Sequence, residues 1–213
     1  MDDISGIRKE YAKPALSEKD VAANPFLQFA KWWDEAIKSE LEEVNAMTLA
    51  TASATGIPSA RIVLLKAATD EGFIFFTNYN SNKGKELAQN PKACLVFFWS
   101  PLERQIRIEG TVEKISEVES DEYFASRPIE SRIGAWASPQ SSVIAARETI
   151  EKNVAMYQQQ FSDGNIPRPR HWGGYIVKPV QVEFWQGRPS RLHDRIQYTL
   201  MEDGGWKIER LAP

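Results

Sequence analysis

The sequence predicts a mainly β protein with peripheral helices, an α+β fold built on an antiparallel β-barrel that is closed or nearly closed. Short apolar runs follow one another over residues 46–115, joined by turns that contain Gly, Pro, Asp or Asn. Only one short helical pattern interrupts these runs, and further strand-like runs return over residues 175–211. Consecutive strands on short turns pair antiparallel, and closing the sheet removes its exposed edges.

The composition is that of a globular protein. The chain has 213 residues, of which 42% are hydrophobic and 26% are charged, and its formal net charge is −3. We expect a flexible N-terminal arm over residues 1–23 and a single domain over residues 24–213 that includes the C-terminal strands. The negative charge argues against general nucleic-acid binding, and no apolar run is long enough to span a bilayer. We therefore expect a cytoplasmic protein with neither nucleic-acid nor membrane partners.

The first helix is predicted after Asn24-Pro25, a capping residue followed by proline at the first helical position. Apolar side chains then recur every three or four residues, which is the spacing of one helical face. We interpret this stripe as core packing, and its members are Phe26, Phe29, Trp33, Ile37 and Leu41.

The remaining elements follow from the same periodicities. Strands are expected over residues 46–53, 60–67, 72–78, 92–99, 105–115, 175–184, 196–201 and 206–211. Helices are expected over residues 81–90 with Ser81 as the cap, over residues 117–126, and over residues 142–160 with Ile144, Ile150 and Val154 facing inward. Residues 161–170 contain Gly and Pro and are expected to form a loop.

Residues 185–195 contain three arginines and one of the two histidines of the chain. If residues 190–195 are extended, Arg191, His193 and Arg195 share one face. Guanidinium groups beside an imidazole suit a phosphorylated, aromatic or redox-active ligand. The alternative interpretation is a solvated, arginine-rich turn.

A cation stands at each end of the apolar segment 61–66, with Arg61 at its start and Lys66 at its end. Positions five apart point to opposite faces of a regular strand. The two cations can therefore serve one pocket only if a bulge intervenes or the pocket wraps the end of the strand. The alternative is a core strand with charged ends.

Two further segments carry polar side chains suited to an anion or a heterocycle. Residues 77–85 place Thr77 and Lys83 between a strand and a helix start, where backbone amides favour phosphate, although the glycine spacing is not that of a P-loop. Gln105 shares a strand face with Arg107 and Glu109, and is either an ordinary exposed residue or a partner for a heterocycle.

Tyr123, Arg127 and Ser131 recur at four-residue steps, although Pro128 should end the helix before Ser131. Residues 136–142 form a polar loop that would ordinarily be read as a helix cap. No nucleophile arrangement or metal-ligand cluster is visible, and the single cysteine, Cys94, is interpreted as a buried, inert thiol. The recurring cations and neutral hydrogen-bonding groups indicate binding of phosphates and flat heterocycles, with a cofactor carrying the chemistry.

Taken in order, these segments closely resemble the pyridoxine/pyridoxamine 5′-phosphate oxidase family, FMN-dependent enzymes that make pyridoxal 5′-phosphate. The resemblance covers essentially the whole chain, and its most specific pieces are residues 61–66, the Tyr123, Arg127 and Ser131 group, Gln140-Ser141, and Trp185 with residues 191–195. It implies a split β-barrel that forms a homodimer with FMN at the subunit interface.

The resemblance also implies the roles of individual residues. FMN would be held by Arg61, Ile62, Val63, Leu64, Leu65, Lys66, Phe76, Thr77, Lys83, Gln105, Gln140, Ser141, Trp185 and Arg195. The substrate would be held by Arg8, Tyr11, Lys66, Tyr123, Arg127, Ser131, Arg191 and His193, with Arg8 and Tyr11 as a lid and with Arg191 and His193 as the catalytic pair. No residue is expected to bind a metal.

The implied reaction is hydride transfer from the substrate C4′ carbon to the flavin N5, followed by reoxidation of the flavin by O2 to give hydrogen peroxide. Both pyridoxamine 5′-phosphate and pyridoxine 5′-phosphate are candidate substrates. One departure from the family pattern is Asn82, where many members carry arginine before the lysine. This departure removes one expected cation from the FMN phosphate site.

Three other functions are compatible with parts of the pattern. A phenazine-pathway flavin oxidase would share the barrel, but four residues together favour a phosphorylated substrate, namely Lys66, Tyr123, Arg127 and Ser131. A non-catalytic carrier of FMN or pyridoxal phosphate would be marked by loss of Arg191 or His193, and both are present. A purely structural β-barrel module would leave the clustered cations unexplained.

Overall fold

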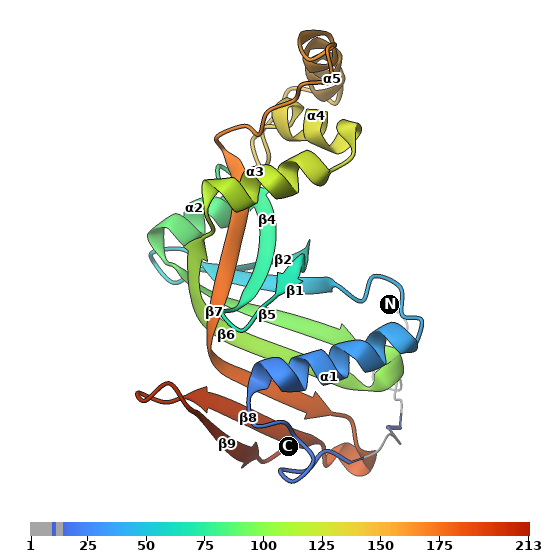
Figure 1. The fold of residues 1–213 in the computed structure, drawn as a ribbon, viewed down its shortest axis with the longest axis vertical. Coiled ribbons are helices and arrows are strands. Elements are labelled where there is room, and N and C mark those ends of the chain that lie inside the picture. The colour runs from blue at the N-terminus through green and yellow to red at the C-terminus, as the bar shows by residue number, and fades with distance from the viewer. Residues whose placement is uncertain (1–9, 12–14) are drawn as a thin grey trace, which may run out of the picture. The chain divides into compact units, whose positions relative to one another are not determined.

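The computed structural model describes residues 10–11 and 15–213 (Figure 1). Its helices are α1 (Pro25–Lys38), α2 (Asn82–Gln89), α3 (Glu117–Ser126), α4 (Ile129–Ala137) and α5 (Glu148–Gln160), with short 3-10 turns at Ser100–Leu102 and Pro189–Arg191. Its strands are β1 (Ala46–Ala52), β2 (Pro58–Leu64), β3 (Ala67–Ala68), β4 (Phe73–Asn78), β5 (Lys92–Trp99), β6 (Arg104–Lys114), β7 (Trp172–Gln186), β8 (Asp194–Leu200) and β9 (Trp206–Leu211).

The described strands form one sheet in the order β2-β1-β5-β6-β7-β4-β3, and β8 pairs with β7 and β9. The pairs β3–β4, β4–β7, β7–β8 and β8–β9 are antiparallel. The prediction of a mainly β fold with peripheral helices is therefore confirmed. The strand boundaries differ from the predicted ones by a few residues at most ends, and the strand predicted over residues 60–67 is found as two, β2 and β3.

The chain divides into two compact units. The first unit consists of residues up to Leu49 together with Cys94–Gly110 and Pro179–Pro213, and the second unit consists of Ala50–Ala93 and Thr111–Lys178. Each unit is built from separate stretches of the chain, because strands such as β6 and β7 contribute residues to both.

The core of the first unit is aromatic and lies against α1. Asn24 caps this helix by accepting from the backbone N–H of Leu27 at 2.9 Å, as predicted. Trp32 meets Phe184 edge to face at 5.2 Å, and Phe29 packs on Phe97 at 5.5 Å. The predicted stripe is only partly right, because Ile37 is 56% exposed while the buried face carries Pro25, Gln28, Phe29, Trp32 and Ala36.

The second unit carries the remaining helices. Strand β4 pairs with the start of β7, so that Phe76 lies opposite Gly174 and Asn78 opposite Trp172. Helix α3 begins with a capping box in which Ser116 and Glu119 satisfy each other's backbone N–H groups. Helices α3, α4 and α5 follow one another along the chain in Figure 1, and a small core cluster of Phe124, Ile133, Ile166 and Trp172 lies among the buried residues of this unit.

Two helix predictions over residues 129–160 are wrong. Helix α5 begins at Glu148 and not at residue 142, because Ser141 has φ 68° and residues 142–146 belong to no helix, so that Arg147 is the residue directly before the helix. Ile144 is consequently 37% exposed and does not face a core. Helix α4 was not predicted, because its nine residues directly follow Pro128, which was read only as the end of the preceding helix.

Residues 190–195 are not extended, so the condition under which Arg191, His193 and Arg195 would share one face is not met. Ser190 has φ 56° and Arg191 has φ 62°, and strand β8 begins only at Asp194. Alternation therefore does not apply across the segment, and Arg191 does not share a strand face with His193 and Arg195.

Cys94 is partly exposed, whereas the sequence predicted a buried thiol. Burial of the thiol, reinforced by the charge of Glu109, nevertheless raises its pKa to about 11. Cys94 is therefore a neutral thiol at neutral pH, which agrees with the predicted lack of reactivity.

Candidate functional site

The second unit contains a cavity of about 660 Å³, within the range of small-molecule sites. Three of its lining residues are cations, and among the lining residues that the structure describes there is no carboxylate. Tyr123 of α3, Arg127 directly after that helix and Ser131 of α4 all line it. The predicted site residues brought together here are Ile62, Val63, Leu64, Lys66, Phe76, Thr77, Lys83, Tyr123, Arg127, Ser131 and Gln140.

One end of the cavity is formed where β4 leads into α2. Ser81 caps α2 by accepting from the backbone N–H of Gly84 at 3.4 Å, and its hydroxyl also donates to the carbonyl of Asn78 at 2.7 Å. Gly84 allows the first turn of the helix to lie against Tyr79, because a Cβ atom at this position would stand 2.2 Å from the Tyr79 carbonyl oxygen. This close approach places Lys83 beside the polar end of the cavity.

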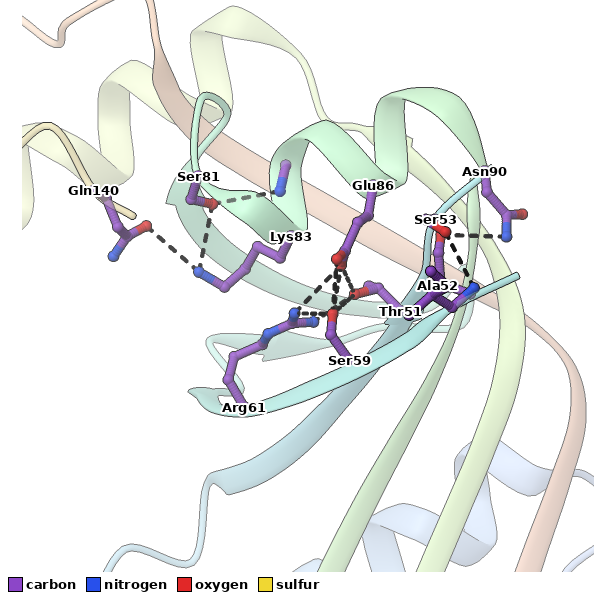
Figure 2. Close-up of polar contacts among 12 residues, drawn as sticks. Thr51, Ala52, Ser53, Ser59, Arg61, Ser81, Lys83, Glu86, Asn90 and Gln140 are labelled. Atoms are coloured by element: carbon purple, nitrogen blue, oxygen red, sulfur yellow. Dashed lines mark hydrogen bonds and ion pairs between the residues drawn. The ribbon is translucent and has the colours of Figure 1, made fainter. Parts of the chain in front are cut away.

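Gln140 joins this polar end from the loop after α4. Its side-chain oxygen accepts from Thr77 at 3.3 Å and from Lys83 at 3.4 Å, as Figure 2 shows for Lys83. Lys83 also lies 3.5 Å from the Ser81 hydroxyl and is 9% exposed. Burial, together with the charge of Arg61, lowers the pKa of Lys83. A buried ammonium group with only neutral partners is suited to an anionic ligand.

Arg61 does not line the cavity. Its guanidinium donates to the hydroxyls of Thr51 and Ser59 and forms an ion pair with Glu86 at 3.3 Å (Figure 2). Glu86 accepts in turn from Thr51 and from Ser59, the latter at 2.7 and 2.8 Å. Arg61 is thus held in a network that joins β1, β2 and α2 of the second unit.

Lys66 lies between β2 and β3, not within a strand. Strand β2 ends at Leu64, and the Lys66 backbone N–H donates to the carbonyl of Ile74 at 2.8 Å. The side chain of Lys66 lines the cavity. Because Lys66 lines the cavity and Arg61 does not, the two cations of the segment 61–66 do not line one pocket, and neither a bulge nor a pocket wrapped around the strand end is needed to explain their positions.

Aromatic rings form another wall of the cavity. Phe76 stacks on Tyr123 with ring centroids 3.9 Å apart and on Trp172 at 5.5 Å. The guanidinium of Arg127 lies 4.5 Å from the centre of the Trp172 ring. This stack brings together residues of β4, α3 and β7.

Arg127 is the least satisfied cation of the cavity. Its Nη1 atom is buried and has no hydrogen-bond partner. Burial also lowers the pKa of this guanidinium. An unsatisfied buried donor costs about 1–3 kcal/mol, more when it is charged, and a bound anion would remove that cost.

A second group of predicted residues lies in the first unit. The rings of Tyr11 and His193 are 5.8 Å apart, and Trp185 lies 4.5 Å from His193 and 5.8 Å from Tyr11. Gly187 makes room for the tyrosine, because a Cβ atom there would stand 2.8 Å from the Tyr11 ring. Arg191 is exposed at the 3-10 turn beside this aromatic group.

His193 is held as a neutral ring. The backbone N–H of Arg188 donates to Nδ1 at 3.1 Å, so that Nδ1 is an acceptor and the neutral ring carries its proton on Nε2. Burial and the charge of Arg191 both lower the pKa of His193. At neutral pH the imidazole can therefore offer a hydrogen-bond donor without a charge.

Arg195 is engaged by a buried carboxylate. Its Nε and Nη2 atoms donate to the two oxygens of Glu183 at 2.7 and 3.1 Å, and Arg107 donates to the same group at 2.8 Å. Glu183 is 2% exposed. The pair raises the pKa of Arg195, so this arginine is a permanently charged and tightly oriented group.

Asp194, next to His193, ties the two ends of the described chain together. One carboxylate oxygen accepts from the backbone N–H of Leu16 at 3.0 Å, and the other accepts from Arg210 at 2.7 Å. Arg210 also pairs with Glu18 at 2.8 Å and donates to the carbonyl of Leu16 at 3.0 Å. These bonds anchor Leu16 and Glu18.

The structure does not bring every predicted residue into these two groups. Arg8 lies outside the described residues. Leu65 is buried and does not line the cavity, and neither Gln105 nor Ser141 is among the cavity-lining residues. Gln105 does lie beside Arg107 on β6, in the first unit, as the strand alternation predicted.

Sequence reasoning missed Thr51, Ser59, Glu86 and Trp172. Two local signals could have found Ser59 and Glu86, whereas no local signal marked Thr51. Ser59 and Arg61 are two apart on a strand and so share a face, and Lys83 and Glu86 are three apart on a helix and so lie on one side. Trp172 carried no signal of its own, because its role depends on stacking with residues far away in the sequence.

Comparison with known proteins assigns the fold and the family. The family model described as pyridoxamine 5'-phosphate oxidase matches residues 33–161, and the one described as pyridoxine 5'-phosphate oxidase C-terminal dimerisation region matches residues 172–213. A pyridoxine/pyridoxamine 5'-phosphate oxidase of Ralstonia pickettii is 58% identical over 213 residues and 100% of both chains. The protein of that name in Trichormus variabilis is 57% identical over 99% of this chain and 98% of its own.

Solved structures agree. The structure of PhzG from Burkholderia lata 383 in complex with tetrahydrophenazine-1-carboxylic acid has a TM-score of 0.87 and 29% identity, covering 94% of this chain and 99% of that one. A pyridoxamine 5'-phosphate oxidase-related, FMN binding protein of Nostoc punctiforme has a TM-score of 0.70 at 17% identity over 91% of this chain and all of its own, which shows a shared fold.

The fold and these matches define a split-barrel oxidoreductase. The chain belongs to the pyridoxine/pyridoxamine 5'-phosphate oxidase family. Among the described residues, no helix has the length and apolar character needed to cross a membrane.

Proposed function

We propose that this enzyme oxidises pyridoxamine 5′-phosphate or pyridoxine 5′-phosphate to pyridoxal 5′-phosphate with FMN as its cofactor. The observation that carries the proposal is the cavity of the second unit. It combines three cations, a wall of stacked aromatic rings and a buried Arg127 nitrogen without a partner. This is the chemistry required by ligands that combine a phosphate with a flat heterocycle.

The residues present fit FMN. At the polar end, Lys83 is buried with only neutral partners and lies near Arg61, so that it can meet a phosphate. Thr77 and Gln140 can donate to or accept from the neighbouring polar atoms of the cofactor. Ile62, Val63 and Leu64 offer apolar side chains and the backbone groups of a strand edge. Trp185 and Arg195 are the further groups that the family pattern assigns to this cofactor.

The substrate phosphate is assigned to a different part of the cavity. Arg127, Lys66, Tyr123 and Ser131 supply two charges and two hydroxyls there. Binding of the phosphate would satisfy the orphaned Nη1 atom of Arg127. This pairing favours a phosphorylated substrate over an unphosphorylated one.

The groups near His193 are assigned to the reacting end of the substrate. Arg191 and the neutral Nε2 donor of His193 would hold the pyridine ring and the C4′ substituent in a near-attack geometry. Tyr11 lies against the His193 and Trp185 rings and would exclude water as part of a lid, together with Arg8.

When bound, FMN would supply the acceptor for the hydride that leaves C4′, and dioxygen would then take the two electrons together with two protons to become hydrogen peroxide. With pyridoxine 5′-phosphate the alcohol also loses its hydroxyl proton, which gives the aldehyde directly. With pyridoxamine 5′-phosphate water enters and ammonia leaves. The role of this chain is to bind, orient and exclude solvent.

We further propose that the enzyme acts as a homodimer with FMN at the subunit interface. The match of residues 172–213 to a dimerisation region supports the dimer. Ile62 is 64% exposed on β2 although it borders the cavity, and an apolar side chain of this kind is suited to a second subunit.

The visible spectrum of the FMN-reconstituted protein tests the proposal. Addition of pyridoxamine 5′-phosphate without oxygen should bleach the flavin band, and air should restore it as pyridoxal 5′-phosphate appears. A protein that retains no flavin would contradict the proposal. If FMN binds but its absorption band is not bleached by either phosphorylated substrate, the result would favour a phenazine-type oxidase or a carrier without activity. The similarity to the Burkholderia lata structure makes the phenazine-type oxidase the second candidate.

A further inference from the structure

Glu86 lies outside the cavity, and no step proposed above uses it. Its carboxylate nevertheless accepts hydrogen bonds from the hydroxyls of Thr51 and Ser59 and forms an ion pair with the guanidinium of Arg61 (Figure 2). Burial alone would raise the pKa of Glu86, but the hydrogen bonds from Thr51 and Ser59 and the charge of Arg61 outweigh it and lower the pKa. Glu86 is therefore a fixed anion at the back of the cationic end of the cavity.

The network places the negative charge of Glu86 near two positive charges, those of Arg61 and Lys83. Arg61 and Lys83 are close enough for the Arg61 charge to lower the pKa of Lys83, and Lys83 is buried. The charge of Glu86 acts in the opposite direction on Lys83. Because Lys83 and Glu86 are three residues apart on α2, one helix carries both the cation of the cavity and the counter-ion that keeps Arg61 in place.

We propose that Glu86 is a positioning residue for the phosphate end of the cofactor site, acting through Arg61 with Thr51 and Ser59. The hydroxyl protons of Thr51 and Ser59 point to the carboxylate, and both hydroxyl oxygens accept from Arg61. This arrangement fixes the guanidinium before an anion arrives and so lowers the ordering cost of binding. The inference rests on the FMN function proposed above.

The saturation of Glu86 explains how an anion can stand near an anion-binding site without competing with the ligand. Its two oxygens accept three contacts from Ser59 and Thr51 in addition to the ion pair. A carboxylate that is fully hydrogen-bonded by its own network holds Arg61 at 3.3 Å from one side. If Glu86 is a simple counter-charge, removing its charge should strengthen FMN binding. If Glu86 positions Arg61, removing its charge should weaken FMN binding.

The experiment compares the dissociation constants of FMN and of riboflavin, which lacks the phosphate, by quenching of flavin fluorescence. The variants are Thr51→Val, which keeps the shape and all charges, Ser59→Ala and Glu86→Gln. The matched control is Glu113→Gln, which removes one carboxylate from the exposed pair with Lys178 in the same unit. Melting temperatures of the flavin-free proteins are recorded for all of them.

We expect Thr51→Val and Glu86→Gln to weaken FMN binding about tenfold, the effect of one charge-assisted hydrogen bond. Riboflavin binding and the control variant should not change. For Glu86→Gln the weaker binding should occur although the site becomes more positive. Tighter FMN binding by Glu86→Gln would show a simple counter-charge and would overturn the proposal.

Equal changes for FMN and riboflavin, with a lower melting temperature, would show a structural role and would also overturn it. Ser59→Ala decides the matter if Thr51→Val does not fold, because the buried Thr51 and the less buried Ser59 bond to the same groups. If the unmodified protein binds neither flavin, the proposed function itself fails. If it binds FMN but the variants keep the same preference for FMN over riboflavin, only the role of Glu86 fails.

Discussion

The backbone N–H of Arg188 donates to Nδ1 of His193 over 3.1 Å, and this bond decides which ring nitrogen carries the proton. Because burial and the charge of Arg191 lower the pKa of His193 from its ordinary value of 6.5, the ring is neutral at neutral pH. The geometry and the electrostatics thus agree on a neutral Nε2 donor.

An NMR titration of the histidine ring protons should give His193 a midpoint below 6.5. Arg191→Met should raise that midpoint, because it removes the neighbouring cation. The chain has two histidines, so His171→Asn assigns the signals. A midpoint at or above 6.5 in the unmodified protein contradicts the prediction.

The sign of the pH effect on stability follows from the same shift. The folded state binds the His193 proton less readily than the unfolded state does, so the unfolded state takes up more protons below about 6.5. The contribution of His193 to the free energy of unfolding is therefore complete above that pH, and it declines as the pH falls through 6.5 towards the lower folded pKa.

Arg191→Ala and His193→Ala should impair turnover far more than flavin retention. Both residues are assigned to orienting the substrate, and a misplaced reacting group costs about 100-fold in rate. The measurement is the rate of anaerobic flavin reduction per bound FMN, with the dissociation constant of FMN determined separately. Loss of FMN with unchanged turnover per bound flavin would refute this assignment.

Arg127→Met should raise the KM of the phosphorylated substrate by about 10- to 100-fold, because the guanidinium is assigned to the substrate phosphate. It should not lower the melting temperature of the substrate-free protein, since the orphaned Nη1 atom is removed together with its cost. Arg132→Met is the control, because Arg132 lies on the neighbouring helix α4, has an orphaned buried Nε atom and does not line the cavity. An unchanged KM for Arg127→Met would exclude its phosphate role.

Asn82→Arg should lower the dissociation constant of FMN by about two- to fivefold, because it adds a cation to the first turn of α2 beside Lys83. Asn82 is exposed, so the longer side chain can be accommodated. Gln89→Arg adds the same charge at the other end of the helix and should leave the constant unchanged. Equal effects of the two variants would show that only the net charge matters.

Much of the fold could be predicted from local patterns. The Asn24 and Ser81 caps and helix α3 were all readable, because a capping side chain and a change of period are encoded within a few residues. The failures lie where backbone geometry departs from the common regions. Ser141 and Ser190 adopt positive φ without being glycine, and no sequence pattern marked them.

The sequence predicted most residues of the candidate site, but it did not predict which of them contact one another. Residue types and order indicated the cavity cations Lys66, Lys83 and Arg127, and the structure places all three there. Arg61 is predicted to hold FMN, and its contact with Glu86 of α2 was not predicted. That partner is 25 positions away in the sequence, and only the folded chain brings the two together.

Asp194 accepts from Leu16, which lies 178 positions away in the sequence, and from Arg210, which lies 16 positions away. The last strand of the chain and Leu16 consequently share one anchor. In a scan of substitutions along the whole gene, Arg210 should therefore group by phenotype with Tyr11 and His193, and not with its neighbours in β9. Distance along the chain is a poor guide to which changes are genetically equivalent in this protein.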